Sequence, residues 1–170
     1  TEGALDYIDY IVSKGVMPEI GYDIATGESA LGAFDCPNLS KVKLGKGITN
    51  IPWGCFSSTA IEGITIPAGV TRIEAYAFGF CSKLTSVTIP AKVKYIGDMA
   101  FVNTFSLTNV IFLGNLPQMN APFYCASFNA AAYYPKGNTT WEKNLDKALW
   151  DSGGLLAVVP YTVNSKGQYV

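Results

Sequence analysis

The side chains that usually carry out catalysis are scarce in this sequence. Its 170 residues include no histidine, which removes the commonest general base, the commonest metal ligand and any Ser-His or Cys-His nucleophile pair. Glu62, Glu74 and Asp98 are the acids nearest to a carboxylate pair, but they occupy different positions within the repeating unit and should project in different directions. We therefore expect no catalytic residue, no metal and no cofactor, and predict that the protein is not an enzyme.

Two short motifs resemble known functional motifs, but the sequence around them does not support those functions. Gly45-Lys46-Gly47 lacks the following Ser or Thr, and the strand-to-helix context, of a phosphate-binding loop. We predict a turn there. Asn138-Thr139-Thr140 has the form of a glycosylation triplet, but we interpret it as the start of a helix, with Thr139 or Thr140 as the capping residue.

The four cysteines suggest disulfides at first, but their positions argue against them. Three of them, Cys36, Cys81 and Cys125, follow a recurring phenylalanine in alternate repeats. Alternate coils of a stacked array lie about 10 Å apart, which is too far for a disulfide. Cys55 replaces an alanine that precedes the phenylalanine in other repeats. We predict that all four are small, buried, unbridged side chains.

These isolated features sit in a sequence dominated by a repeat. A phenylalanine recurs at intervals of 22, 22, 23 and 22 residues, at Phe34, Phe56, Phe78, Phe101 and Phe123. Each copy also contains the pattern Leu-x-x-Val-x-Ile-Pro followed by Val-x-x-Ile, most clearly over residues 77–99 and 55–76. A period of this length is typical of a solenoid of stacked coils, so we predict five coils in one domain.

Within each coil, the apolar positions predict two inward-facing walls. The first is a strand, beginning at residues 39, 61, 84 and 107, whose last residues alternate inward and outward. Pro67 and Pro90 end this strand, because proline cannot donate to a central ladder. All coils run in the same direction, so these strands should form a parallel sheet. A second extended piece should point residues such as Val70 and Ile73 inward.

The two ends of the array differ from the repeats, as capping segments must. Leu5, Ile8, Ile11 and Val12 recur at helical spacing, which predicts an amphipathic helix over residues 4–14. A similar spacing of apolar residues predicts a second helix over 138–150, which Gly153-Gly154 ends. A strand is predicted over 155–161.

These motifs resemble the BspA-like leucine-rich repeats of bacteria, also called the Treponema pallidum type. LTSVTIP at 84–90, VKYIGDMAF at 93–101 and the Tyr-Tyr-Pro-Lys-Gly tail at 133–137 carry the resemblance. It implies a right-handed leucine-rich repeat solenoid. We place the repeats at residues 29–135, between a capping segment at 1–28 and a capping helix and strand at 136–170. The resemblance also implies secreted or cell-surface proteins, many from host-associated Bacteroidetes and spirochaetes, that are associated with adhesion to host proteins or other cells.

The charge and hydropathy of the chain exclude some partners. The formal net charge is -1, so we expect no nucleic-acid binding. No stretch approaches the roughly 20 apolar residues that span a bilayer, so this segment is not expected to insert into a membrane. Because the chain begins at Thr1, we expect an export signal or anchor to have been removed from an extracellular or surface protein.

The remaining candidate for function is the outward face of the predicted sheet. Two columns of outward positions cross the coils: Lys43, Thr65, Thr88, Ile111 and Ala132, and beside them Lys41, Gly63, Ser86, Asn109 and Ala130. We select from them a candidate partner-binding set: Lys41, Lys43, Thr65, Ser86, Thr88, Asn109 and Ile111. The alternative interpretation is that hydroxyl side chains simply suit an exposed parallel sheet. Ile111 either belongs to a contact patch or packs against the C-terminal segment.

Three functions follow from these observations. The first is an adhesin-like module that binds a protein, such as host extracellular matrix or another cell surface. The second is a passive spacer within a larger surface protein. The third is a glycan-binding module, less favoured because the predicted columns contain no aromatic platform; Trp53, Tyr95 and Tyr134 would then be its platforms.

Overall fold

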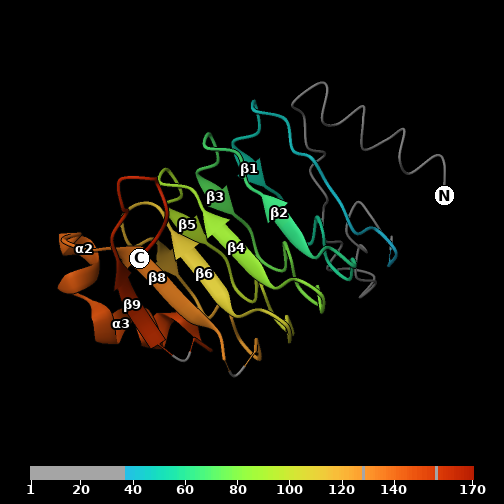
Figure 1. Cartoon of the computed structure of the whole chain (residues 1–170). Helices are drawn as coiled ribbons and strands as arrows, with labels where there is room; N and C mark the ends of the chain where they lie inside the picture. Colours follow the sequence, from blue (N-terminus) through green and yellow to red (C-terminus); the bar gives the residue numbers. More distant parts are fainter. Residues whose placement is uncertain (1–36, 128, 156) are drawn as a thin grey trace.

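The chain winds into a solenoid with two parallel β-sheets (Figure 1), seen here in a computed structural model that describes residues 37–127, 129–155 and 157–170. The long sheet has the strand order β2-β4-β6-β8-β9, and the short sheet the order β1-β3-β5-β7. Every one of these strand pairs is parallel, and neighbouring strands come from successive coils, as predicted. The long sheet comprises β2 (Gly63–Thr65), β4 (Ser86–Ile89), β6 (Asn109–Phe112), β8 (Ala131–Pro135) and β9 (Ala157–Tyr161). The short sheet comprises β1 (Asn50–Ile51), β3 (Arg72–Ile73), β5 (Tyr95–Ile96) and β7 (Gln118–Met119).

The recurring phenylalanines form one stack through the core. The rings of Phe56, Phe78, Phe101 and Phe123 are fully buried and lie nearly parallel, with centroid distances of 5.4, 5.2 and 5.1 Å. Val70 and Ile73 of the second wall are also fully buried, which confirms the prediction of two inward-facing walls. Phe34, the first in the series, lies outside the described residues.

Each coil turns around its phenylalanine with left-handed backbone on both sides of it. The residue two positions before the ring has φ of 60, 57, 54 or 47°, at Gly54, Tyr76, Met99 and Ala121. The residue two positions after it has φ of 61, 63, 55 or 52°, at Ser58, Phe80, Asn103 and Cys125. Only one of these eight residues is glycine, although side chains disfavour this region. Backbone hydrogen bonds between successive coils, such as Phe56 N to Ala77 O at 2.8 Å, hold the turns in place.

The structure places the cysteines in different environments. Cys55 and Cys81 are buried as predicted, and burial raises the pKa of both thiols. The Cys81 Sγ donates to the Phe56 carbonyl at 3.0 Å. The prediction for Cys125 is wrong, because this residue is exposed at the left-handed position after Phe123. All three are unbridged, and Cys36 lies outside the described residues.

Gly97 is a position where successive coils meet without room for a side chain. A Cβ added there would lie 2.5 Å from the Ala75 backbone nitrogen, whereas one added at Gly63 would have nothing within 4 Å. We expect Gly97→Ala to lower the free energy of unfolding by about 1–3 kcal/mol, since the coils must separate locally. Gly63→Ala, the matched control on an exposed strand, should change it by less than about 0.5 kcal/mol. Equal urea midpoints for the two variants would contradict this account of coil spacing.

The first coil departs from the prediction. Residues 39–44 were expected to form a strand, but they form none, and β2 is the edge strand of the long sheet among the described residues. This segment ends in Leu44-Gly45, where the next two coils have Ile66-Pro67 and Ile89-Pro90, and among the described residues no strand precedes it with which it could pair. The turn predicted at residues 45–47 is present, closed by Ile48 N to Gly45 O at 3.2 Å.

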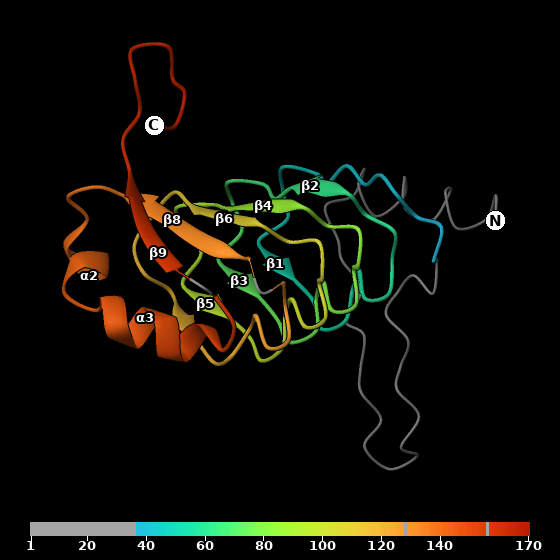
Figure 2. The same cartoon turned by 60° about the horizontal axis from the view of Figure 1, so that its bottom comes forward.

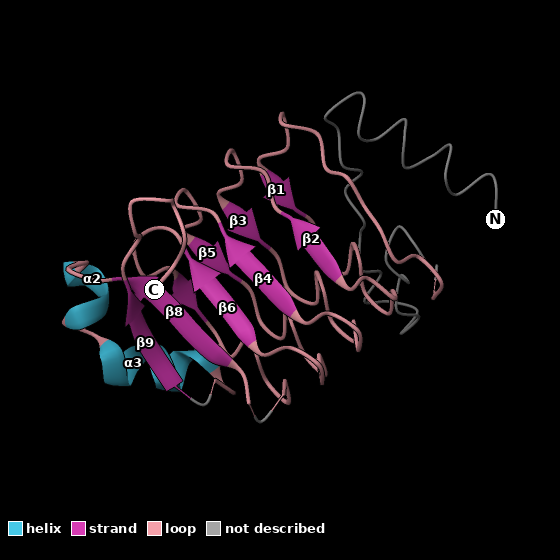
Figure 3. Cartoon of the chain, viewed as in Figure 1, coloured by secondary structure: helices cyan, strands magenta, loops and turns pink. Residues whose placement is uncertain are grey.

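The predicted C-terminal helix is two short helices, α2 (Thr139–Glu142) and α3 (Leu145–Ser152), both at the β9 end of the solenoid (Figure 3). Asn138, rather than Thr139 or Thr140, caps α2. Its Oδ1 accepts from the Thr140 N–H at 3.1 Å and from the Thr140 hydroxyl at 2.7 Å. The helix breaks at Asn144, whose carbonyl accepts the first hydrogen bond of α3, from Ala148 N at 2.8 Å. The helix expected over residues 4–14 lies outside the described residues.

The end of α3 and strand β9 together close the last coil. The carbonyls of Asp151 and Ser152 accept from Ala121 N at 2.7 Å and Phe123 N at 2.9 Å, as a further coil would. Strand β9 confirms the strand predicted over 155–161 and adds to β8 in parallel. At its end, Lys136 N of the preceding coil donates to Tyr161 O at 2.9 Å.

Candidate binding site on the long sheet

The outward face of the long sheet carries two columns whose register the structure defines. One runs through Gly63, Ser86, Asn109, Ala131 and Ala157, and the other through Thr65, Thr88, Ile111, Tyr133 and Val159. The prediction placed Ala130 and Ala132 in these columns, and both are instead fully buried. In the fifth coil the sequence-based count was one residue short, and a slip of one residue exchanges the two faces of a strand.

This correction places an aromatic side chain on the face. Tyr133 stands next to Ile111 in the second column, so the prediction that the columns lack an aromatic residue is wrong. A shallow pocket of about 190 Å³ lies at this end of the face, lined by Asn109, Ile111, Tyr133, Tyr161 and Tyr169. Ile111 therefore lies beside Tyr161 and Tyr169 of the C-terminal segment, which was the second of the two alternatives for this residue.

Tyr161 forms the wall of the pocket and is itself well anchored. Its side chain is 8% exposed and its hydroxyl donates to the Phe112 carbonyl at 3.1 Å, so it reaches across β8 to β6. Burial, and then the neighbouring Tyr169 phenol, raise the pKa of Tyr161. The hydroxyl therefore remains a protonated donor to Phe112 at neutral pH.

The chain after β9 supplies the last aromatic ring. Residues 162–170 turn back on themselves and rise away from the sheet (Figure 2), and Thr162 and Val170 exchange two backbone hydrogen bonds of 2.8 Å. This C-terminal ribbon brings Tyr169 edge-on to Tyr161, with ring centroids 4.8 Å apart. Tyr169 is nevertheless 48% exposed, so part of its ring is open to a ligand.

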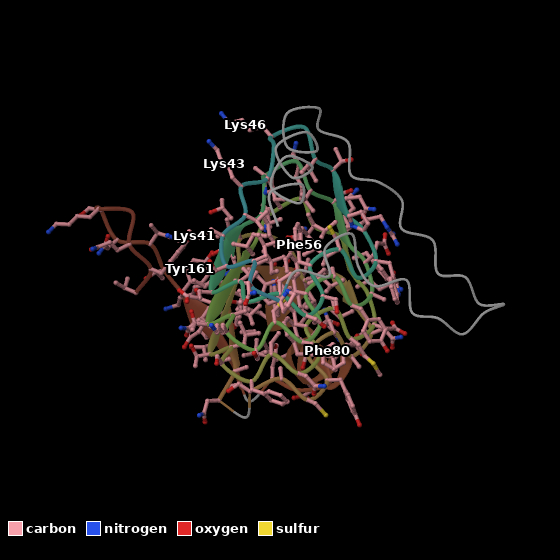
Figure 4. The ribbon with its side chains drawn as sticks, turned by 90° about the vertical axis from the view of Figure 1, so that its right-hand side faces the viewer. Lys41, Lys43, Lys46, Phe56, Phe80 and Tyr161 are labelled. Carbon is pink, nitrogen blue, oxygen red and sulfur yellow. The ribbon has the colours of Figure 1, made fainter. Side chains whose placement is uncertain are left out.

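The predicted candidate residues lie together on this side of the solenoid. Thr65 and Ser86 are exposed in β2 and β4, and Thr88, Asn109 and Ile111 are half-buried in β4 and β6. Lys41 and Lys43 are exposed in the first coil beside β2. Figure 4, which looks along the solenoid, shows Lys41, Lys43 and Tyr161 on one side and Phe56 in the interior.

The short sheet is a weaker candidate because its polar and aromatic groups already contact one another. The Arg72 guanidinium lies 4.2 Å from the centre of the Tyr95 ring and pairs with Glu74 at 2.8 Å. Trp53 packs against Tyr76 with ring centroids 5.6 Å apart. Tyr134 is buried against the cap, so the prediction of a glycan platform at Tyr134 is wrong.

Two of the three acids singled out in the sequence, Glu74 and Asp98, each have a partner of their own. Glu74 pairs with Arg72, and Asp98 accepts from Asn120 Nδ2 at 2.5 Å. Within residues 37–170, except 128 and 156, no group of Cys, Asp and Glu side chains could hold a metal ion. In the same residues, no helix has the length and apolar content needed to cross a membrane.

The sequence held a signal for the missed residue Tyr133. The Ile-Pro pairs at 66–67 and 89–90 correspond to Tyr134-Pro135 in the last coil, and counting back from them places Tyr133 beside Thr88 and Ile111. No comparable signal existed for Tyr161 and Tyr169, because both follow the last repeat; Tyr161 reaches the face at the end of β9, and Tyr169 reaches it through the C-terminal ribbon.

Comparison with known families identifies the solenoid. Residues 32–130 match the BspA type leucine-rich repeat region in six copies, so the chain belongs to this family. Searches of curated proteins and of solved structures found no match. Membership defines the chain as a leucine-rich repeat module of the kind found in surface proteins, a fold that typically serves as a scaffold rather than as an enzyme.

Proposed function

We propose that this protein is a secreted or cell-surface, adhesin-like module that binds a protein ligand on the outward face of its long sheet. The observation that carries the proposal is the aromatic end of this face, where Ile111, Tyr133 and Tyr169 surround an open pocket. Tyrosine is enriched at protein interfaces, where its ring buries apolar area and its hydroxyl still finds a partner. Family membership supports a surface location, and host extracellular matrix or another cell surface would then be the natural partner.

The face also has the shape of an interface. It is a continuous parallel sheet crossed by small and hydroxyl side chains, so a partner can approach the backbone closely along its whole length. Val159 extends the apolar end by one more strand, being 37% exposed beside Tyr133. Contiguous apolar surface of this kind on a repeat protein indicates a contact site.

The test is capture of ligands by the immobilised full chain from matrix proteins and cell-surface fractions. We expect the double variant Ile111→Ser with Tyr133→Ala to weaken binding about tenfold or more, because truncating an anchoring side chain of an interface typically costs about 2 kcal/mol or more. Arg72→Ala with Tyr95→Ala is the matched control on the short sheet and should leave affinity unchanged. Binding that survives the first variant would move the site away from the long sheet, and absence of any saturable ligand would favour a passive spacer.

A further inference from the structure

The chemistry of the aromatic pocket narrows the kind of protein ligand it can take. We infer that the long sheet binds an extended acidic segment of the partner and that the pocket at Tyr133 and Tyr169 receives a proline of that segment. This inference rests on the proposed function and names the chemistry of the ligand at the same face.

The lining of the pocket favours a proline ring. Three of its five residues are tyrosines, a fourth is Ile111, and no charged side chain lines it. Grooves lined by aromatic rings are the recurring receptors for proline-rich segments, which are extended before binding and so lose little entropy. A proline ring placed between Tyr133 and Tyr169 would bury its apolar faces against the two tyrosine rings.

The unused hydroxyl groups of the pocket also favour a proline-containing peptide as the ligand. Within the described residues, the hydroxyls of Tyr133 and Tyr169 make no hydrogen bond, whereas the Tyr161 hydroxyl is used by Phe112. Two phenolic donors therefore point to a ligand rich in acceptors. A proline peptide has backbone carbonyls but lacks the N–H of other residues, so it leaves no donor unsatisfied in an apolar pocket.

A sugar ring is a poorer fit to this set of groups. Sugars carry several hydroxyls, each of which needs a partner when it is buried. The lining offers Asn109 as its only amide and no carboxylate. The Asn109 amide already donates to Thr108 Oγ1 at 3.1 Å.

The charge of the face indicates what lies beside the proline. Lys41 and Lys43 are exposed, and the salt bridges of the described residues, Arg72 with Glu74 and Lys147 with Asp151, include neither of them. The two columns from β2 to β9 contain no acidic side chain. The face is thus positive at one end and uncharged elsewhere, which is complementary to an acidic ligand.

The spacing of the coils sets the distance between the lysines at one end of the face and the aromatic pocket at the other. Lys43 belongs to the first coil and Tyr133 to the fifth, and four steps of about 4.8 Å make roughly 19 Å. An extended proline-type segment advances about 3.1 Å per residue. The acidic residues should therefore lie about six residues from the proline.

The probe is a short synthetic peptide with a Pro-Pro pair separated by about six residues from an Asp-Asp pair, together with the same sequence reversed. Titration into the full chain, followed by calorimetry and by NMR of the tyrosine rings, should show saturable binding of one of the two. Alanine in place of the prolines should weaken it about tenfold. Asparagine in place of the aspartates should abolish its salt dependence.

Variants of the protein locate the site. Tyr133→Ala and Tyr169→Ala should each weaken the peptide about tenfold, and Lys41→Ser with Lys43→Ser should weaken it about threefold at low salt. Tyr95→Ala on the short sheet is the control and should have no effect. Tyr169 is half-exposed on the C-terminal ribbon, so its removal leaves the folded core intact.

The results of these experiments distinguish the proposed protein-binding function from the inference about an acidic, proline-containing ligand. Peptides that fail to bind, or that bind equally well without proline or without Tyr133, overturn the inference. A neutral glucose or N-acetylglucosamine oligomer bound at the same tyrosines would overturn it in favour of a glycan site. If a captured protein partner still depends on Ile111 and Tyr133, the proposed function stands without the inference; if it does not, both are wrong.

Discussion

Replacing Phe101 by alanine should lower the free energy of unfolding by about 3–5 kcal/mol. Phe101 lies in the middle of the ring stack, with Phe78 5.2 Å away on one side and Phe123 5.1 Å away on the other. The variant removes a fully buried ring and leaves a cavity that the neighbours cannot fill, because their own coils hold them by backbone hydrogen bonds.

Urea unfolding followed by circular dichroism measures this loss. Phe105→Ala is the matched control, because it is the same substitution in the same coil at a side chain that is 63% exposed. We expect that control to change the free energy of unfolding by less than about 0.5 kcal/mol. Similar losses in the two variants would mean that the stack contributes little to stability.

Replacing Trp141 by alanine should have an effect of similar size at the end of the solenoid, about 3–5 kcal/mol. Trp141 is the buried residue of α2, and its ring lies 4.7 Å from Phe112 and 5.4 Å from Tyr134. Its Nε1 donates to the Gly114 carbonyl at 3.0 Å. Loss of this side chain therefore exposes the last coil and leaves the Gly114 carbonyl with only the longer hydrogen bond, of 3.4 Å, from Asn138 Nδ2.

Trp141→Phe separates the contribution of ring packing from that of the hydrogen bond to Gly114. It keeps a ring against Phe112 and Tyr134 but removes the hydrogen bond to Gly114, so we expect a loss of about 1–3 kcal/mol. Differential scanning calorimetry of the two variants and the parent protein checks this order. A Trp141→Ala protein that melts at the parent temperature would show that α2 does not stabilise the array.

The regular part of the fold was predictable because its signals repeat. Five phenylalanines at a period of 22 or 23 residues define the coils without any knowledge of contacts, and the apolar positions between them define both walls. The left-handed turns around each phenylalanine were not predictable, since residues such as Tyr76 and Ala121 have no preference for that backbone. Tertiary hydrogen bonds between coils impose it.

The candidate site was predicted in part, and the missing part has a physical cause. Thr65, Thr88, Asn109 and Ile111 lie on the long sheet as expected, because periodicity alone decides which face a strand residue occupies. Ala130 and Ala132 were predicted on this face in place of Ala131 and Tyr133, by a shift of one residue at the end of the array. Tyr169 is brought to the pocket by a segment outside the repeat, and no periodic rule applies to it.

The last strand of the long sheet determines where the solenoid stops. The Tyr161 carbonyl bonds to Lys136, so by the alternation of a parallel strand the neighbouring Pro160 faces the open edge of the sheet. Proline has no N–H to offer there, and Pro160 is exposed. Another chain seeking to add a strand at this edge would meet a blocked position. Pro160 therefore disfavours the addition of a further strand at this edge of the long sheet.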